Sequence, residues 1–134
     1  MAAGYSGTPL ARKLSLKDDM QVWAEGMPET VAGEIRSAAS VTFTAAPQPP
    51  LEAAHIFVTS RALLEARLRQ LLPQLAPIGF VWVSWPKKAS KVPTDITEDV
   101  IRDVALPMGL VDVKVCAVDE TWSGLKLMIR RENR

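Results

Sequence analysis

The segment Phe80-Val-Trp-Val-Ser-Trp-Pro-Lys-Lys-Ala-Ser-Lys-Val-Pro-Thr-Asp-Ile-Thr-Glu-Asp99 decides how the rest of the chain is interpreted. Residues 80–84 are apolar on both faces, which is typical of a central strand in a parallel sheet that helices cover. Lysines and prolines follow, and they indicate a loop. Asp95, with Glu98 three positions later, predicts a helix that begins at Asp95 as its N-cap in a capping-box arrangement. We therefore expect a strand, a lysine-bearing loop and a helix in succession.

The overall composition is that of a soluble globular chain. It has 134 residues, 48% of them hydrophobic, which suits a single domain over residues 1–134. The formal net charge is only +1, so no global field favours nucleic acid or a membrane surface as partner. The single cysteine, Cys116, excludes an internal disulfide. Without a signal peptide or a long apolar run, a cytoplasmic location is expected.

The N-terminal half predicts alternating strands and helices. Thr8 followed by Pro9 is typical of a helix start, although residues 1–15 as a whole are expected to be partly flexible. Proline and alanine dominate residues 45–54, which we interpret as a loop because proline removes hydrogen-bond donors. The expected elements are a short helix over 10–14, a strand over 20–24, a helix opened by Pro28 and a strand over 41–44.

The C-terminal half continues the alternation and ends in a hairpin. Ser60 is a natural cap for a helix over 61–72, whose leucines recur at helical spacing. The remaining elements are strands over 55–59, 80–84, 110–118 and 125–130, and the helix behind Asp95, with a polar turn over 119–124. This order predicts an α/β fold of three layers, with a mostly parallel sheet of about six strands that ends in an antiparallel β-hairpin.

This arrangement, over residues 16–131, resembles the C-terminal half of the Rossmann-like class I S-adenosylmethionine-dependent methyltransferases. The segment Leu16–Trp23 is similar to the turn that leads into the family's first strand. The resemblance implies a degenerate methyltransferase-like enzyme as an alternative function. Glu25–Glu29 departs from the family's glycine-rich turn because it has a single glycine, and no acidic residue follows Thr44 where the family has one.

Four motifs resemble a small bacterial family of unknown function. They are Ser6–Leu10, Trp85–Ser90, Thr94–Asp99 and Leu110–Leu125. The resemblance implies a bacterial cytoplasmic protein and carries no activity, cofactor or site residue.

The lysine loop, residues 85–99, is the candidate ligand site. It follows a strand end and precedes a helix N-terminus, where ligands of open α/β sheets bind. We expect it to bind an anionic small molecule or a protein partner. The alternative is a solvated loop whose lysines are neutralised by Asp95, Glu98 and Asp99. The candidate residues are Trp85, Lys87, Lys88, Ser90, Lys91 and Thr94.

The other chemically distinctive residues favour structural roles. Trp82 is expected in the core, and Asp119–Gly124 is expected to be a turn bonded to its own backbone. The sole histidine, His55, lies far from Cys116 in sequence, so no Cys–His pair is expected. No catalytic set, cofactor or metal site is identified, which favours a binding domain over an enzyme. The edge of the C-terminal hairpin allows pairing with a second copy.

Overall fold

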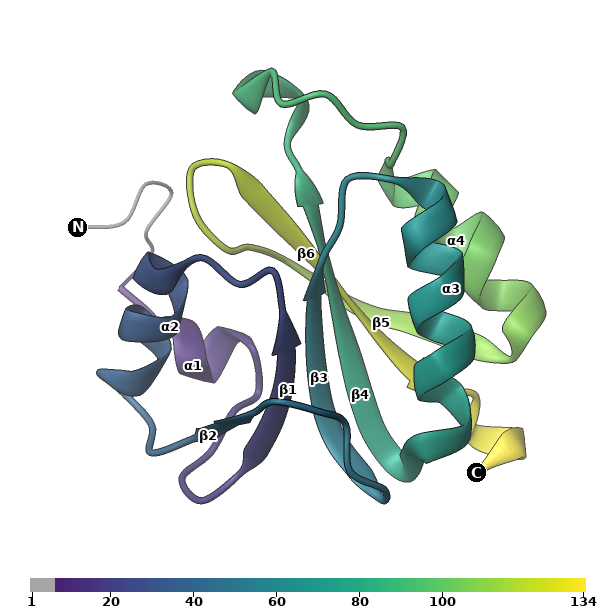
Figure 1. The fold of residues 1–134 in the computed structure, drawn as a ribbon, viewed down its shortest axis with the longest axis horizontal. Helices are drawn as coiled ribbons and strands as arrows, with labels where there is room; N and C mark the ends of the chain where they lie inside the picture. The colour runs from purple at the N-terminus through teal and green to yellow at the C-terminus, as the bar shows by residue number, and fades with distance from the viewer. Residues whose placement is uncertain (1–6) are drawn as a thin grey trace.

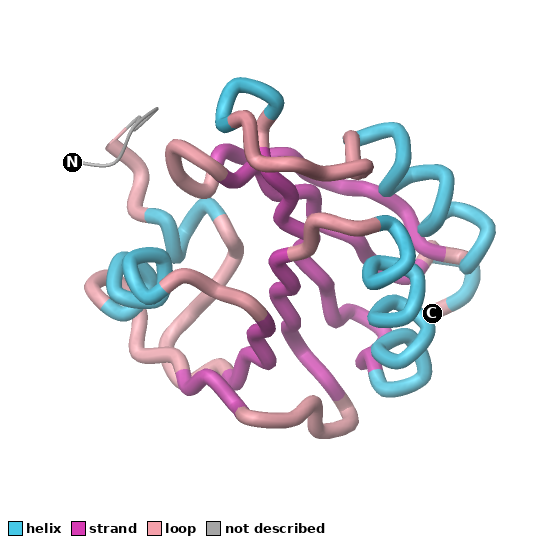
Figure 2. Tube along the Cα trace, turned by 45° about the horizontal axis from the view of Figure 1, so that its top comes forward, coloured by secondary structure: helices cyan, strands magenta, loops and turns pink. Residues whose placement is uncertain are grey.

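A six-stranded sheet with helices on both faces forms the described part of the chain, residues 7–134 of a computed structural model (Figures 1 and 2). The strands are β1 (Gln21–Glu25), β2 (Thr42–Thr44), β3 (Leu51–Phe57), β4 (Leu75–Pro86), β5 (Leu110–Ala117) and β6 (Trp122–Ile129). The α-helices are α1 (Leu10–Lys13), α2 (Glu29–Arg36), α3 (Arg61–Leu71) and α4 (Glu98–Ala105).

The strand order across the sheet is β2-β1-β3-β4-β6-β5. The pairs β1–β2, β1–β3 and β3–β4 are parallel, whereas β6 runs antiparallel to both of its neighbours, β4 and β5. Parallel strands need long connections, and helices supply most of them. The predicted fold class, a mostly parallel sheet closed by an antiparallel hairpin, is confirmed.

Two hydrophobic cores lie on opposite faces of the sheet. Along β4, Val81 and Val83 belong to the core under α3 and α4, whereas Phe80 and Trp82 belong to the core under α1 and α2. This alternation explains why the strand reads as apolar at every position, because both of its faces are covered. Trp82 is 1% exposed, which confirms its expected place in the core.

Three strands begin several residues earlier than the sequence expectation. Residues 51–54, assigned above to a loop, belong to β3, where Leu51, Ala53 and Ala54 are buried. Strand β4 begins at Leu75 and contains Pro77, and β6 begins at Trp122, inside the expected turn. An irregularity in the β3–β4 register between Leu51 and Ala53 lets β4 accommodate Pro77.

Two helix starts also differ from the expectation. The N-cap of α4 is Thr97, whose hydroxyl accepts a hydrogen bond from the Val100 N–H at 3.2 Å, and not Asp95. The Asp95 carboxylate instead accepts from the Arg61 N–H at 2.7 Å, at the start of α3. At α1 the N-cap position is Pro9 rather than Thr8. The Ser60 cap of α3 is confirmed, since its hydroxyl accepts from the Leu63 N–H.

The N-terminal segment is packed from Leu10 onward. Leu10 and Leu14 are buried, and the Leu14 carbonyl accepts a hydrogen bond from the Trp82 indole N–H at 2.9 Å. Residues 1–6, part of the segment expected to be flexible, lie outside the described residues. Within residues 7–134, no helix has the length and apolar character needed to cross a bilayer.

Candidate functional site

The carboxyl ends of β1, β3 and β4 meet at one edge of the sheet, and the lysine loop rises beyond that edge (Figure 1). Strand β4 ends at Pro86, and the loop then crosses to the start of α4. The β5–β6 turn and the start of α3 lie near the same edge. The sequence prediction that the loop lies at a strand-to-helix junction on the carboxyl side is therefore confirmed.

Lys87 joins the loop to the β5–β6 turn. Its backbone N–H donates to the Thr121 carbonyl at 2.7 Å, and its ammonium group donates to the Asp119 carbonyl, also at 2.7 Å. The Asp119 carboxylate accepts from the backbone N–H groups of Thr121 and Trp122, which confirms the expected self-bonded turn. Lys87 thus holds two loops together.

Thr94 and Asp95 join the other end of the loop to β3 and α3. The Thr94 hydroxyl donates to the Thr59 carbonyl at 2.7 Å and accepts from the Ile96 N–H. Thr59 follows the end of β3, so this bond lays the loop across the carboxyl edge. Asp95 accepts a hydrogen bond from the Arg61 N–H, so the same stretch of the loop is also bonded to the start of α3.

Ser90 shapes the middle of the loop. Its hydroxyl donates to the Lys87 carbonyl at 2.6 Å and accepts from the Val92 N–H at 3.3 Å. Lys91 follows with a φ of 61°, in the left-handed region that non-glycine residues rarely adopt. Lys88 and Lys91 are both exposed.

The carboxylates near the loop are bound to other groups. Glu98 and Asp99 both pair with the Arg102 guanidinium, at 2.7 and 3.3 Å. The hydrogen bonds of Arg102 with Glu98 and then with Asp112 raise the pKa of Arg102. Asp95 and Asp119 accept backbone N–H groups. Among residues 7–134, every ion pair uses an arginine and none uses a lysine.

Trp85 is the one candidate that points into the protein. It is 8% exposed and belongs to the core under α3 and α4. The structure therefore brings Lys87, Ser90 and Thr94 together as the residues that hold the loop, and leaves Lys88 and Lys91 as its exposed cations.

The point where the strand order reverses, between β1 and β3, is another place where such sheets bind ligands. Gly26 follows β1 with a φ of +72°, and a Cβ there would lie 3.1 Å from the Phe57 carbonyl oxygen. Glu25 pairs with Arg67 of α3 at 2.7 Å, and this contact raises the pKa of Arg67. The glycine thus serves the packing of β1 against β3, and the acidic residue is held by α3.

A buried polar pair lies on the α1 and α2 side of the sheet, and sequence reasoning missed it. The His55 Nε2 lies 2.6 Å from the Ser84 hydroxyl, and both residues are almost fully buried. His55 stacks on Phe57, and its Nδ1 has no partner within residues 7–134. Burial lowers the pKa of His55 to about 3, which keeps the imidazole neutral. Both side chains are closed off from solvent in this structure.

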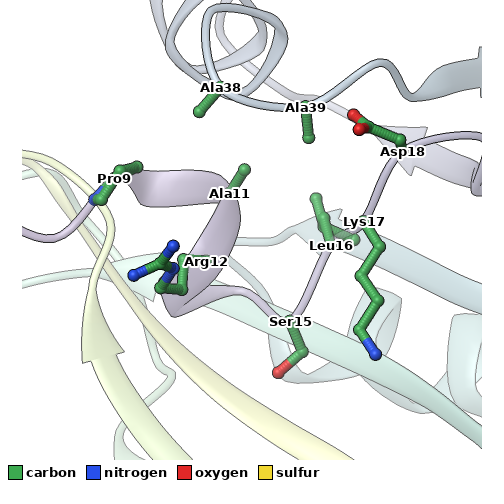
Figure 3. Close-up of a pocket in the computed structure, with 9 residues that line it drawn as sticks. All are labelled: Pro9, Ala11, Arg12, Ser15, Leu16, Lys17, Asp18, Ala38 and Ala39. Carbon is green, nitrogen blue, oxygen red and sulfur yellow. The ribbon is translucent and has the colours of Figure 1, made fainter.

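Hollows lie away from the lysine loop, two of them beside the helices. One of about 360 Å³ is bounded by α1, the chain after it and the end of α2; Figure 3 shows Ala11, Ala38 and Ala39 gathered around it. The other, of about 380 Å³, lies between α3 and α4 and is lined by Leu72 and Val104 among others. No cluster of three metal-ligating side chains occurs within the described range.

Comparisons with known proteins identify the fold. No family model and no curated protein matches the chain. Solved structures do match: a SAM-dependent methyltransferase from Aquifex aeolicus (15% identity, 90% of this chain and 87% of that one, TM-score 0.62) and a putative type 11 methyltransferase from Sulfolobus solfataricus (11%, 96% and 92%, 0.65). A precorrin-6y C5,15-methyltransferase from Geobacter metallireducens also matches (13%, 90% and 84%, 0.51).

At these identities the likeness shows the fold alone, which is Rossmann-like and methyltransferase-like. It extends over nearly the whole length of the Aquifex and Sulfolobus chains, and not only over a C-terminal half. The resemblance to a bacterial family of unknown function finds no support in these comparisons and stays a prediction.

Proposed function

We propose that this chain is a binding domain that takes an anionic small molecule at the lysine loop, with Lys88 and Lys91 as its contact residues. One observation carries the proposal: neither lysine has an ion-pair partner within the described residues, while Glu98 and Asp99 are bound to Arg102 and Asp95 and Asp119 accept backbone N–H groups. Lys87, Ser90 and Thr94 hold the backbone in place, which reduces the entropy that a ligand must overcome.

Titration calorimetry with nucleotides and phosphorylated metabolites tests the proposal. We expect the wild-type chain to bind one of these anions and the variant Lys88→Ala/Lys91→Ala to lose about tenfold or more in affinity, since hydrogen bonds to charged groups each contribute about 1.5–3 kcal/mol. Arg131→Ala, an exposed cation near the C-terminus, is the matched control and retains binding. Failure of the wild-type chain to bind any of the anions would refute the small-molecule proposal.

An acidic segment of a partner protein is the other ligand that these two lysines fit. Titration with an acidic peptide distinguishes it, because salt weakens a peptide held by exposed charges. Pairing with a second copy along the edge strand β5 also stays a prediction. Light scattering tests it, and a monomer at high concentration would remove it.

A degenerate methyltransferase-like enzyme is the second candidate, and the fold likeness to the Aquifex and Sulfolobus proteins favours it. We rank it second because the β1 turn has a single glycine, and that glycine packs against Phe57. Thermal unfolding with S-adenosylmethionine separates the candidates. A clear rise in Tm with this compound, and none with phosphorylated metabolites, would reverse the ranking.

A further inference from the structure

Three lysines gather where α1 meets the β5–β6 hairpin, well away from the lysine loop in the sequence. Lys13 is the last residue of α1, and Lys114 and Lys126 face each other across β5 and β6. We call Lys13, Lys114 and Lys126 the lysine triad. Like charges placed directly opposite each other on antiparallel strands are destabilising, so this arrangement calls for an explanation.

One role of these lysines is structural, because they attach the end of α1 to the sheet by hydrogen bonds. Lys114 donates to the Lys13 carbonyl at 2.8 Å, and Lys126 donates to the Ser15 hydroxyl at 3.0 Å. Lys13 in turn reaches back to the Ala117 carbonyl at 2.8 Å. Ser15 has a φ of 62°, which turns the chain after α1. Neutral donors can make such bonds, as Trp82 does to Leu14, so docking alone does not require three positive charges.

The charge of the triad is not balanced by neighbouring carboxylates. None of the three lysines takes part in an ion pair within residues 7–134. Lys13 and Lys126 are half-buried and Lys114 is exposed, so a ligand can approach from the Lys114 side. Burial, and then repulsion by the charge of Lys114, lowers the pKa of Lys126.

Each ammonium group retains unused donors. An ammonium carries three N–H donors, and each lysine of the triad makes one hydrogen bond within the described part of the chain. The Lys126 ammonium also lies over the Phe80 ring, 4.4 Å from its centroid, so Lys13 and Lys114 have the most free donors. Several donors and three positive charges, carried by α1 and the two strands to which its end is hydrogen-bonded, match a group with several oxygens and more than one negative charge. A phosphate group has this chemistry, and a single carboxylate has less of it.

We propose that Lys13, Lys114 and Lys126 form a second anion site, which takes the phosphate group of a small phosphorylated molecule. The site is separate from the lysine loop and does not depend on the function proposed for it. Phosphate binding offsets the repulsion between Lys114 and Lys126 and strengthens the attachment of α1 to the hairpin.

Cys116 supplies a reporter for this site. It is the only cysteine, is half-buried and lies on the same side of β5 as Lys114, two residues away. Burial raises the pKa of its thiol, while the charges of Lys13 and Lys114 lower it. An anion that neutralises these lysines therefore raises the thiol pKa and slows alkylation, because the thiolate is the reactive form.

The experiment measures the rate of Cys116 alkylation by neutral iodoacetamide in inorganic phosphate and in sodium chloride of equal ionic strength. We expect phosphate to slow wild-type alkylation about threefold, because lysines neutralised by phosphate no longer favour the thiolate form of Cys116. The variants Lys114→Met and Lys126→Met lose this response, whereas Lys88→Met in the lysine loop keeps it. Equal rates in the two salts, or a full response in both triad variants, would overturn the proposal.

A second measurement needs no variant. In amide NMR spectra of the wild-type chain, inorganic phosphate is expected to shift the signals of Lys13, Lys114, Cys116 and Lys126. Shifts confined to residues 87–97 would place the anion at the lysine loop alone and refute the second site. Shifts confined to the triad would support the second site and count against the function proposed for the loop.

Discussion

At the scale of single residues, His55 is the group that most directly links pH to stability. Its pKa is about 3 in the folded chain and about 6.5 when unfolded, so the unfolded state takes up the proton first. The free energy of unfolding therefore falls as pH drops from about 6.5 towards 3. Between pH 7 and pH 5 the expected loss is about 2 kcal/mol, which urea unfolding at the two pH values measures.

The matched variant for this prediction is His55→Leu/Ser84→Ala, which removes both members of the buried pair. It leaves no unpaired polar group, and we expect it to lose most of the pH dependence. Ser84→Ala alone leaves Nε2 of His55 without a partner and costs about 1–3 kcal/mol at neutral pH. An unchanged pH dependence in the double variant would assign the acid sensitivity to other groups.

Two glycines give opposite predictions for the same substitution. A Cβ on Gly79 would lie 2.5 Å from the Leu51 carbonyl oxygen, a backbone atom that cannot move aside easily. Gly33, inside α2, has nothing within 4 Å of that position. We expect Gly79→Ala to lower stability by about 1–3 kcal/mol and Gly33→Ala to raise it by about 0.5–1 kcal/mol. Chemical denaturation of both variants checks the signs, and a shared sign would contradict this account.

At the scale of elements, two residues near the start of α4 bind the ends of two different helices, whereas the sequence suggested a single cap there. Thr97 caps α4, and Asp95 holds the start of α3 together with Ser60. We expect Thr97→Ala and Asp95→Ala each to cost about 1 kcal/mol, and the two costs to add because they affect different helices. Asp95 and Ser60 both bind the start of α3, so the stability costs of Asp95→Ala and Ser60→Ala are expected not to add. A double-mutant cycle by urea unfolding measures both, and additivity in the second pair would disprove the shared role.

The sequence was sufficient for the order of elements but not for contacts between distant residues. Leucine spacing predicted α3, and apolar runs predicted the strands, because burial dictates these patterns locally. The capping-box spacing from Asp95 to Glu98 is equally local, yet the Arg61 N–H, 34 positions earlier, binds Asp95 instead. Likewise, the apolar run predicted a strand only from Phe80, and only the pairing of β4 with β3 shows that the strand begins at Leu75 and includes Pro77.

In the candidate site too, local patterns were predictable from the sequence and contacts between distant residues were not. The junction between β4 and α4 was predictable from the strand pattern, and so was the charge of the loop. That Trp85 faces the core, and that Lys87 is bonded to the Asp119 carbonyl, depends on how the loop meets the hairpin. The lysine triad was missed for the same reason, since Lys13 and Lys114 are 101 positions apart.

At the scale of the whole molecule, one sheet connects both cores, and this predicts a single unfolding unit. Trp82 belongs to the core under α1 and α2, and Trp85, three residues later in β4, belongs to the core under α3 and α4. Neither core can lose its strands without exposing the other. We therefore expect the two sides to unfold together, as the single-domain prediction from the sequence requires.

Two variants that each retain one tryptophan measure this directly. One keeps Trp82 and the other keeps Trp85, with phenylalanine at the remaining tryptophan positions. In each variant, the fluorescence transition in urea is expected to coincide with the transition in far-UV circular dichroism, because each probe reports the same loss of the sheet. A Trp82 signal that changes at lower urea than the dichroism would mean that the α1 and α2 layer detaches first. The core on that side would then be a separate cooperative unit, held to the sheet by contacts such as the one between Trp82 and Leu14.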